Sequence, residues 1–199
     1  NYLFYHAAKK NIKEFLVQEK ELIEKNEVII LGLEKKVETP FPVELNGEVI
    51  NMKLRGTLDR IDRVNGKLRI IDYKTGQPPS KNQVEAHLAP QLSLEAAMVA
   101  VGAFAGVAAI DSEVLSYIKL SGNNIPGVYM PVCQGTENVS VLAEGALQKL
   151  EELVAHYAQI ETGYLSLAQP QTTRYEGAYD HLARVAEWRG LDTDEESRS

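Results

Sequence analysis

Apolar residues recur at helical spacing along the first 25 residues of the chain. This pattern predicts a long amphipathic helix from about Tyr2 to Lys25, which we expect to cover a sheet. Its apolar positions are Ala8, Ile12, Phe15, Leu16, Leu22 and Ile23. The stretch Ser140 to Ile160 has the same period and predicts another helix, with an apolar face of Leu142, Ala146, Leu150, Leu153, Val154 and Tyr157. The small apolar residues from Ala96 to Ile110 predict a buried core helix.

Extended segments alternate with these helices. An extended region begins at Val28 to Leu33 and runs past Thr39-Pro-Phe-Pro42, where two prolines imply an edge strand or a bend. Asn46-Gly47 and Asn65-Gly66 each predict a hairpin, because Asn-Gly readily supplies the positive φ angles of a two-residue turn. Glu113 to Leu120 predicts a further strand. This order predicts an α/β fold, with a mixed central β-sheet that carries hairpins and is flanked by helices.

The turn at Asn65-Gly66 fixes which residues oppose each other in its hairpin. Asp59 is expected opposite Asp72 and Thr57 opposite Lys74, so Asp59, Asp72 and Lys74 share one face. Opposed carboxylates repel each other unless positive charge lies between them. The arrangement therefore predicts a divalent cation site, although solvated charges on an exposed hairpin are the alternative.

The chemistry of these residue types suits a metal-dependent nuclease. Magnesium prefers carboxylate oxygens and keeps several waters, and a bound metal can generate hydroxide for attack on a phosphodiester. The ammonium of Lys74 could orient the attacking water and offset charge in the transition state. The opposite face pairs Asp62 with Arg69 and Leu58 with Tyr73, and we interpret those pairs as structural.

Two segments of this hairpin resemble a known family. Gly56-Thr-Leu-Asp-Arg-Ile-Asp62 and Ile70-Ile-Asp-Tyr-Lys-Thr-Gly76 resemble motifs II and III of the RecB-type PD-(D/E)XK nucleases. The resemblance implies a restriction-endonuclease-like fold in which Asp59 and Asp72 bind Mg²⁺ or Mn²⁺. It also implies that the backbone carbonyl of Tyr73 adds a metal ligand and that Lys74 is the catalytic lysine.

A third segment, Pro90-Gln-Leu-Ser-Leu-Glu95, resembles the helix motif of these nucleases. The resemblance implies that Gln91 is a catalytic residue that contacts the site and that the residue four positions later supports it. Gln91 and Glu95 are one helical turn apart, so both can face the hairpin. An ordinary helical pair is the alternative.

Other segments resemble the C-terminal nuclease domain of the AddB family of double-strand-break repair proteins. They are Gly76-Gln-Pro-Pro-Ser80, His87-Leu-Ala-Pro-Gln-Leu92 and Tyr179-Asp-His-Leu-Ala-Arg-Val-Ala-Glu-Trp188. This resemblance implies a DNA exonuclease with an AddA-like helicase subunit or domain as partner, located in the cytoplasm with the nucleoid. The part before Gly76 resembles one branch of these nucleases and the part after it another, as a chimeric or trimmed chain would.

The family usually has a histidine metal ligand in a helix ahead of the hairpin, in a Gly-x-x-x-His motif. His6 lacks that context, because tyrosine stands at position 2 where glycine is expected. His6 is thus either the first metal ligand or a packing histidine, and Glu38 is either an acidic substitute or an ordinary edge-strand glutamate. A competing function follows: a non-catalytic nuclease-fold module that binds DNA or acts as a scaffold, or a fragment inactive without the histidine.

Composition bounds the remaining possibilities. With 199 residues and 44% apolar content, the chain suits one domain, which we place at residues 1–190, followed by an acidic tail at 191–199 with the composition of disorder. The net charge of −7 indicates that tight DNA binding is supplied by a partner.

One cysteine excludes an internal disulfide and a four-cysteine iron-sulfur cluster. No P-loop, secretory signal or membrane-spanning run is found. Residues 173–182 are expected to form a docking helix or, alternatively, to contact a nucleic acid.

Overall fold

The structure is a computed structural model that describes residues 2–25, 27–45, 47–107, 109–120, 127–159 and 162–163, with the backbone alone for residues 2–8. The chain divides into two compact units, residues 1–155 and 156–199. Most of the second unit is outside the described residues, including the predicted helix at 173–182 and the predicted tail. The domain boundary at residue 190 therefore stays a prediction.

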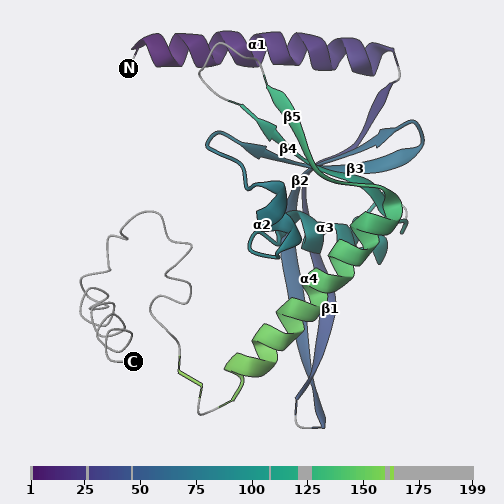
Figure 1. Cartoon of the computed structure of the whole chain (residues 1–199). Coiled ribbons are helices and arrows are strands. Elements are labelled where there is room, and N and C mark those ends of the chain that lie inside the picture. Colours follow the sequence, from purple (N-terminus) through teal and green to yellow (C-terminus); the bar gives the residue numbers. More distant parts are fainter. Residues whose placement is uncertain are drawn as a thin grey trace, which may run out of the picture. The chain divides into compact units, whose positions relative to one another are not determined.

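A five-stranded sheet forms the centre of the first unit (Figure 1). Its strands lie in sequence order: β1 (Val28–Leu45), β2 (Glu48–Val64), β3 (Lys67–Lys74), β4 (Ser112–Lys119) and β5 (Val128–Gln134). Neighbouring strands are antiparallel except for the parallel pair β3 and β4. That parallel step requires a crossover, which contains α2 (Lys81–Glu85) and α3 (Gln91–Ala100). The mixed sheet with flanking helices confirms the predicted α/β fold class.

Both predicted hairpins are present. Asn65 and Gly66 have φ angles of 51° and 82°, as a two-residue turn of the mirror-image type requires. Gly47 has a φ of 82° and joins β1 to β2. The predicted register of the second hairpin is confirmed from its turn as far as the pair of Arg60 with Ile71.

Beyond that pair the prediction was wrong. Asp59 and Asp72 are not a backbone pair, and neither are Thr57 and Lys74. The reason is that β2 continues along β1 in a long two-stranded ribbon, while β3 continues along β4. Strands β2 and β3 therefore separate, and Leu58 joins the main core instead of lying opposite Tyr73 on the other face.

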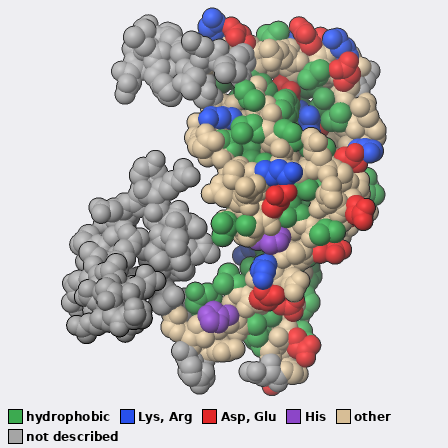
Figure 2. Space-filling view, in the orientation of Figure 1, with side chains coloured by type: hydrophobic (Ala, Val, Ile, Leu, Met, Phe, Trp, Pro, Cys, Tyr) green, Lys and Arg blue, Asp and Glu red, His purple; other side chains and the backbone are tan. Residues whose placement is uncertain are grey.

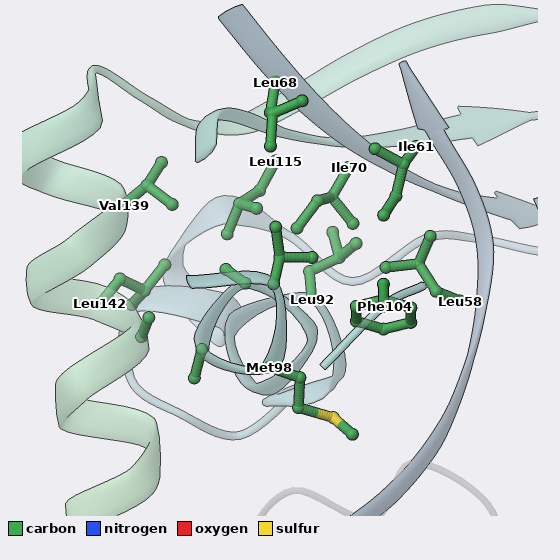
Figure 3. Close-up of a cluster of buried hydrophobic side chains, with 14 of the residues drawn as sticks. Leu58, Ile61, Leu68, Ile70, Leu92, Met98, Phe104, Leu115, Val139 and Leu142 are labelled. Atoms are coloured by element: carbon green, nitrogen blue, oxygen red, sulfur yellow. The ribbon is translucent and has the colours of Figure 1, made fainter. Parts of the chain in front are cut away.

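The main core lies on the face of the sheet covered by α3 and by α4 (Thr136–Tyr157) (Figure 3). Strand residues Leu58, Ile61 and Ile70 pack there against Leu92 and Met98 of α3. Helix α4 contributes its N-terminal half, through Val139, Leu142, Ala143 and Ala146. The predicted apolar face of α4 was partly wrong, since Leu153 in the C-terminal half is 53% exposed.

The predicted buried helix from Ala96 to Ile110 is shorter than expected. Helix α3 ends at Ala100, and Gly102 follows with a φ of 71°, a left-handed conformation that stops a helix at little cost for glycine. Phe104 and Val107 are still buried in the core after this turn, whereas Ile110 is exposed.

Helix α1 (Tyr2–Glu24) covers the opposite face of the sheet, as predicted (Figure 1). Its buried positions differ from the prediction: Asn11, Phe15 and Glu19 are buried, while Ile12, Leu16 and Ile23 are exposed. The helix therefore packs through a narrow stripe with a four-residue period, and two of its three members are polar.

A buried polar cluster, which we call the α1-face network, explains this polar stripe. Its members are Glu19, Arg60, Asp62, Arg69, Tyr73 and Tyr129. Arg60 is central: it forms an ion pair with Glu19 of α1 and donates to Asp62 at 2.6 Å. Arg69 donates to the second oxygen of Asp62 at 2.8 Å, in the pair predicted from the hairpin. The network fixes α1 on the sheet through charges, so polarity does not mean exposure here.

No helix in the described residues is both long and apolar enough to cross a membrane.

Candidate active site

Two aspartates lie where β2 and β3 separate. Asp72 is 2% exposed, and the carboxylate of Asp59 accepts a hydrogen bond at 3.0 Å from the backbone N–H of Tyr73. This N–H would have paired with β2 if the strands had stayed together. The side chain of Asp59 thus bridges the strands at the point where their ladder ends, which holds its carboxylate beside β3.

Lys74 and Gln91 both bind Asp72. The ammonium of Lys74 lies 2.6 Å from Asp72 Oδ2, and Gln91 Nε2 donates to Asp72 Oδ1 at 2.6 Å. Lys74 Nζ also donates to Gln91 Oε1 at 3.3 Å, which closes a ring of three polar side chains. The structure therefore brings together Asp72, Lys74 and Gln91 from a strand and a later helix, and their chemical roles stay predictions.

Glu95 extends this group along α3. Gln91 Nε2 donates to Glu95 Oε1 at 3.1 Å, which is the helical contact expected one turn later. Burial, together with the nearby charges of Asp72 and Asp59, raises the pKa of Glu95 to about 8. The ring of Tyr117 on β4 lies near the site, with its centroid 5.7 Å from Lys74 Nζ. Burial, together with the negative charges of Asp72 and Glu95, raises the pKa of Tyr117 to about 12. The site therefore has an excess of negative charge.

The backbone carbonyl of Tyr73 was predicted to bind metal. In a β-strand the N–H and C=O of one residue face the same neighbouring strand. Because the Tyr73 N–H faces Asp59, its carbonyl is on the same side of β3, next to the gap between the two strands. This position is compatible with the predicted ligand role.

The donor chemistry fits a hard divalent cation. Asp59 and Asp72 offer carboxylate oxygens, and Glu95 has a buried oxygen, Oε2, that accepts no hydrogen bond among the described residues. Lys74 is the only ion-pair partner that the structure gives to Asp72 in the described part of the chain. No group of three or more His, Cys, Asp or Glu side chains within that part is arranged to hold a metal. The ligand roles of Asp59, Asp72 and the Tyr73 carbonyl therefore stay predictions.

The two suggested replacements for the first ligand have different outcomes. The side chain of His6 is outside the described part of the structure, so its role as a ligand stays a prediction. Glu38 forms ion pairs with Lys53 and Arg55, each at 2.5 Å, on the β1–β2 ribbon. Its pKa is lowered by these hydrogen bonds. Glu38 therefore has the role of an ordinary strand glutamate.

Comparison with known proteins agrees with this geometry. A family model of the PD-(D/E)XK nuclease superfamily matches residues 4–187. The chain belongs to this superfamily. Its members are generally metal-dependent nucleases, so a nuclease-type function follows at that coarse level.

The chain matches only a small part of the curated relatives' length. An uncharacterized protein of Rickettsia bellii is 32% identical over 89 residues, which is 44% of this chain and 8% of the relative. The gene 69 protein of Mycobacterium phage L5 is 46% identical over 43 residues, or 22% of this chain and 13% of that protein. The crystal structure of SSO0001 has a TM-score of 0.32 at 21% identity, over 68% of this chain and 57% of that one.

The molecular surface carries both signs of charge. On the face drawn in Figure 2, lysines and arginines are interspersed with aspartates and glutamates among the described residues. This agrees with the composition of the sequence, in which acidic residues outnumber basic ones, with 28 Asp and Glu against 21 Lys and Arg. A strong electrostatic footprint for nucleic acid is not visible on that face.

Sequence reasoning did not find the environment of Glu95 or Tyr117. Glu95 was expected only to support Gln91, and its burial depends on packing between α3 and the sheet. Tyr117 is an aromatic residue in an apolar strand, which is typical of any sheet. For Glu95 the sequence indicated only that the side chain could face the hairpin, and for Tyr117 it gave no local signal for proximity to the aspartates.

Proposed function

We propose that this chain is a metal-dependent deoxyribonuclease domain that hydrolyses phosphodiester bonds, acting as an exonuclease in double-strand-break repair. The observation that supports the proposal best is the contact of Asp72 with Lys74 and Gln91 beside Asp59. Carboxylates from two strands and a lysine converge there on the face covered by α3. Membership of the PD-(D/E)XK nuclease superfamily supports the same reaction.

Each residue has a defined task in this proposal. Asp59, Asp72 and the Tyr73 carbonyl would hold Mg²⁺ or Mn²⁺, which would lower the pKa of a water so that hydroxide is available to attack phosphorus, and would offset charge on the phosphate. Lys74, paired with Asp72, orients the attacking water, and its positive charge stabilises the transition state. Gln91 holds both Asp72 and Lys74 in position through its amide.

The biological setting is also part of the proposal. The chain spans under a tenth of the Rickettsia relative, 8% of its length, so we treat it as one domain of a larger assembly. We propose a RecB- or AddB-type helicase-nuclease, with an AddA-like helicase subunit or domain that supplies the tight DNA binding. Such a complex would act in the cytoplasm on the nucleoid.

The decisive test is cleavage of end-labelled single- and double-stranded DNA by the purified chain with Mg²⁺ or Mn²⁺. We expect Asp72→Asn and Lys74→Met each to lose at least about 100-fold in rate, as is usual when a group that stabilises developing charge is removed. The exposed residues Asp111 and Lys13 provide matched controls, since Asp111→Asn and Lys13→Met should cleave like the parent. Equal activity in all variants would show that the proposed residues are not catalytic.

One observation favours a second candidate function. Tyrosine stands at position 2, where the family's Gly-x-x-x-His motif has glycine, so the first metal ligand lacks its usual sequence context. In that case the chain would bind DNA or a helicase as a scaffold. A folded parent that binds DNA without cutting it, with either metal, would favour this function over catalysis.

A further inference from the structure

Glu95 is a buried carboxyl group with only one of its two oxygens hydrogen-bonded to the described residues. The residue is 5% exposed, and its Oε1 accepts from Gln91 Nε2 at 3.1 Å. Its other oxygen, Oε2, is buried and accepts no hydrogen bond from the residues that the structure describes. Burying a charged carboxylate without a partner is costly, so this position requires either a proton or a cation.

Two other carboxyl groups lie near Glu95. Asp72 and Asp59 are close enough to raise its pKa further above the effect of burial. Gln91 uses its amide nitrogen on both acids, donating to Asp72 at 2.6 Å and to Glu95 at 3.1 Å. Lys74 forms its ion pair with Asp72. Among the described residues Lys74 is the one cation that the structure pairs with these acids, and it pairs with Asp72 alone.

We propose that Glu95 is a third acidic group of the metal site, whose negative charge strengthens binding of a divalent cation at Asp59 and Asp72. The inference rests on the metal site of the proposed function. Glu95 need not touch the ion, because magnesium and manganese sites keep bound waters that an outer carboxylate can orient. This agrees with the finding that no three acidic side chains in the described residues form a direct ligand set.

A purely structural role for Glu95 makes a different prediction. If Glu95 only held the amide of Gln91, then any acceptor of the same shape would serve. Glu95→Gln keeps the shape of the side chain and an oxygen that can accept from Gln91, and it replaces the second oxygen by an uncharged NH2 group. Metal affinity in this variant therefore separates the two roles.

The experiment measures Mn²⁺ binding to the metal-free chain by the loss of the free Mn²⁺ signal in electron paramagnetic resonance, without DNA. We expect Glu95→Gln to weaken Mn²⁺ binding about 10-fold or more, the usual effect of removing a group that supports metal ligands. Glu144→Gln, on the exposed face of α4, is the matched control and should bind like the parent. Asp72→Asn should abolish binding.

A second variant covers a failure of the first to fold, which urea unfolding would reveal. Glu95→Asp keeps the charge with a shorter side chain, so it should bind Mn²⁺ more tightly than a neutral substitution such as Glu95→Met. The reverse order, or a Glu95→Gln variant with parental affinity, would overturn the inference and leave the proposed aspartate site intact. Absence of Mn²⁺ binding by the parent would overturn both. Weakened binding in Glu95→Gln together with a parent that cuts no DNA would support the inference and refute only the nuclease activity.

Discussion

The raised pKa of Glu95 makes the stability of the metal-free protein depend on pH. Its pKa is about 8 in the folded protein, against an ordinary value of 4.5. The folded state therefore keeps a proton that the unfolded chain releases over this range. The contribution of protonated Glu95 to the stability of the folded state is complete below about pH 4.5, and it is lost as the pH rises through about 8.

The size of this effect follows from the shift. One pKa unit corresponds to about 1.4 kcal/mol, so we expect the contribution of Glu95 to the free energy of unfolding to fall by about 3 to 4 kcal/mol between about pH 5 and about pH 8. That is a large fraction of the stability of a typical domain, about 5 to 15 kcal/mol. The cause is the enclosed position of Glu95, which is 5% exposed, close to Asp72 and Asp59.

Urea unfolding in EDTA at several pH values would measure the effect. The parent is compared with Glu95→Gln, which cannot ionise, so that the four histidines contribute equally to both proteins. We expect the difference in stability between the parent and the variant to change by about 1.4 kcal/mol per pH unit within the window. Parallel pH profiles would refute the reasoning, because they would mean that the carboxyl is solvated in the folded state.

Two further predictions concern the two faces of the sheet. Arg60→Leu should destabilise the protein by about 3 to 5 kcal/mol in urea unfolding, since it leaves Glu19 and Asp62 buried without their shared cation; a loss below about 1 kcal/mol would show that this network is solvated. Leu92→Ala, at a fully buried position of the main core, should cost about 2 to 5 kcal/mol by calorimetry. The same change at exposed Leu153 should cost less than about 0.5 kcal/mol, and equal losses at both positions would contradict the described core.

The hairpin that carries the site could be predicted because its signals are local. Asn65-Gly66 determines the turn, and the turn fixes the pairing of the residues nearest to it. The separation of β2 from β3 could not be predicted in the same way. It depends on β1, which continues along β2, and on the parallel pairing of β3 with β4, two contacts that the hairpin sequence does not encode.

Buried polar residues were the other source of error. Helical periodicity assigned Ile12 and Leu16 of α1 to the buried face, yet Glu19 is buried and both of these residues are exposed. The cause is Arg60, far along the chain, whose ion pair with Glu19 determines how the helix is rotated on the sheet. A hydrophobic pattern cannot detect this. A charged residue in a sequence is normally assigned to the surface, but an ion pair with a distant residue allows it to be buried.

The order of strands in the sheet has a consequence for how the protein folds. Strands β1, β2 and β3 are successive neighbours joined by tight turns, and such local contacts form quickly. The parallel pairing of β3 with β4 must wait until the crossover closes, and that closure costs chain entropy. Asp59 and Asp72 thus belong to an early hairpin, whereas Gln91 and Glu95 arrive with the slower crossover. We expect a nascent chain to pass through a state in which Asp59, Asp72 and Lys74 are already close together while Gln91, which holds Asp72 and Lys74 in position, has not yet joined them.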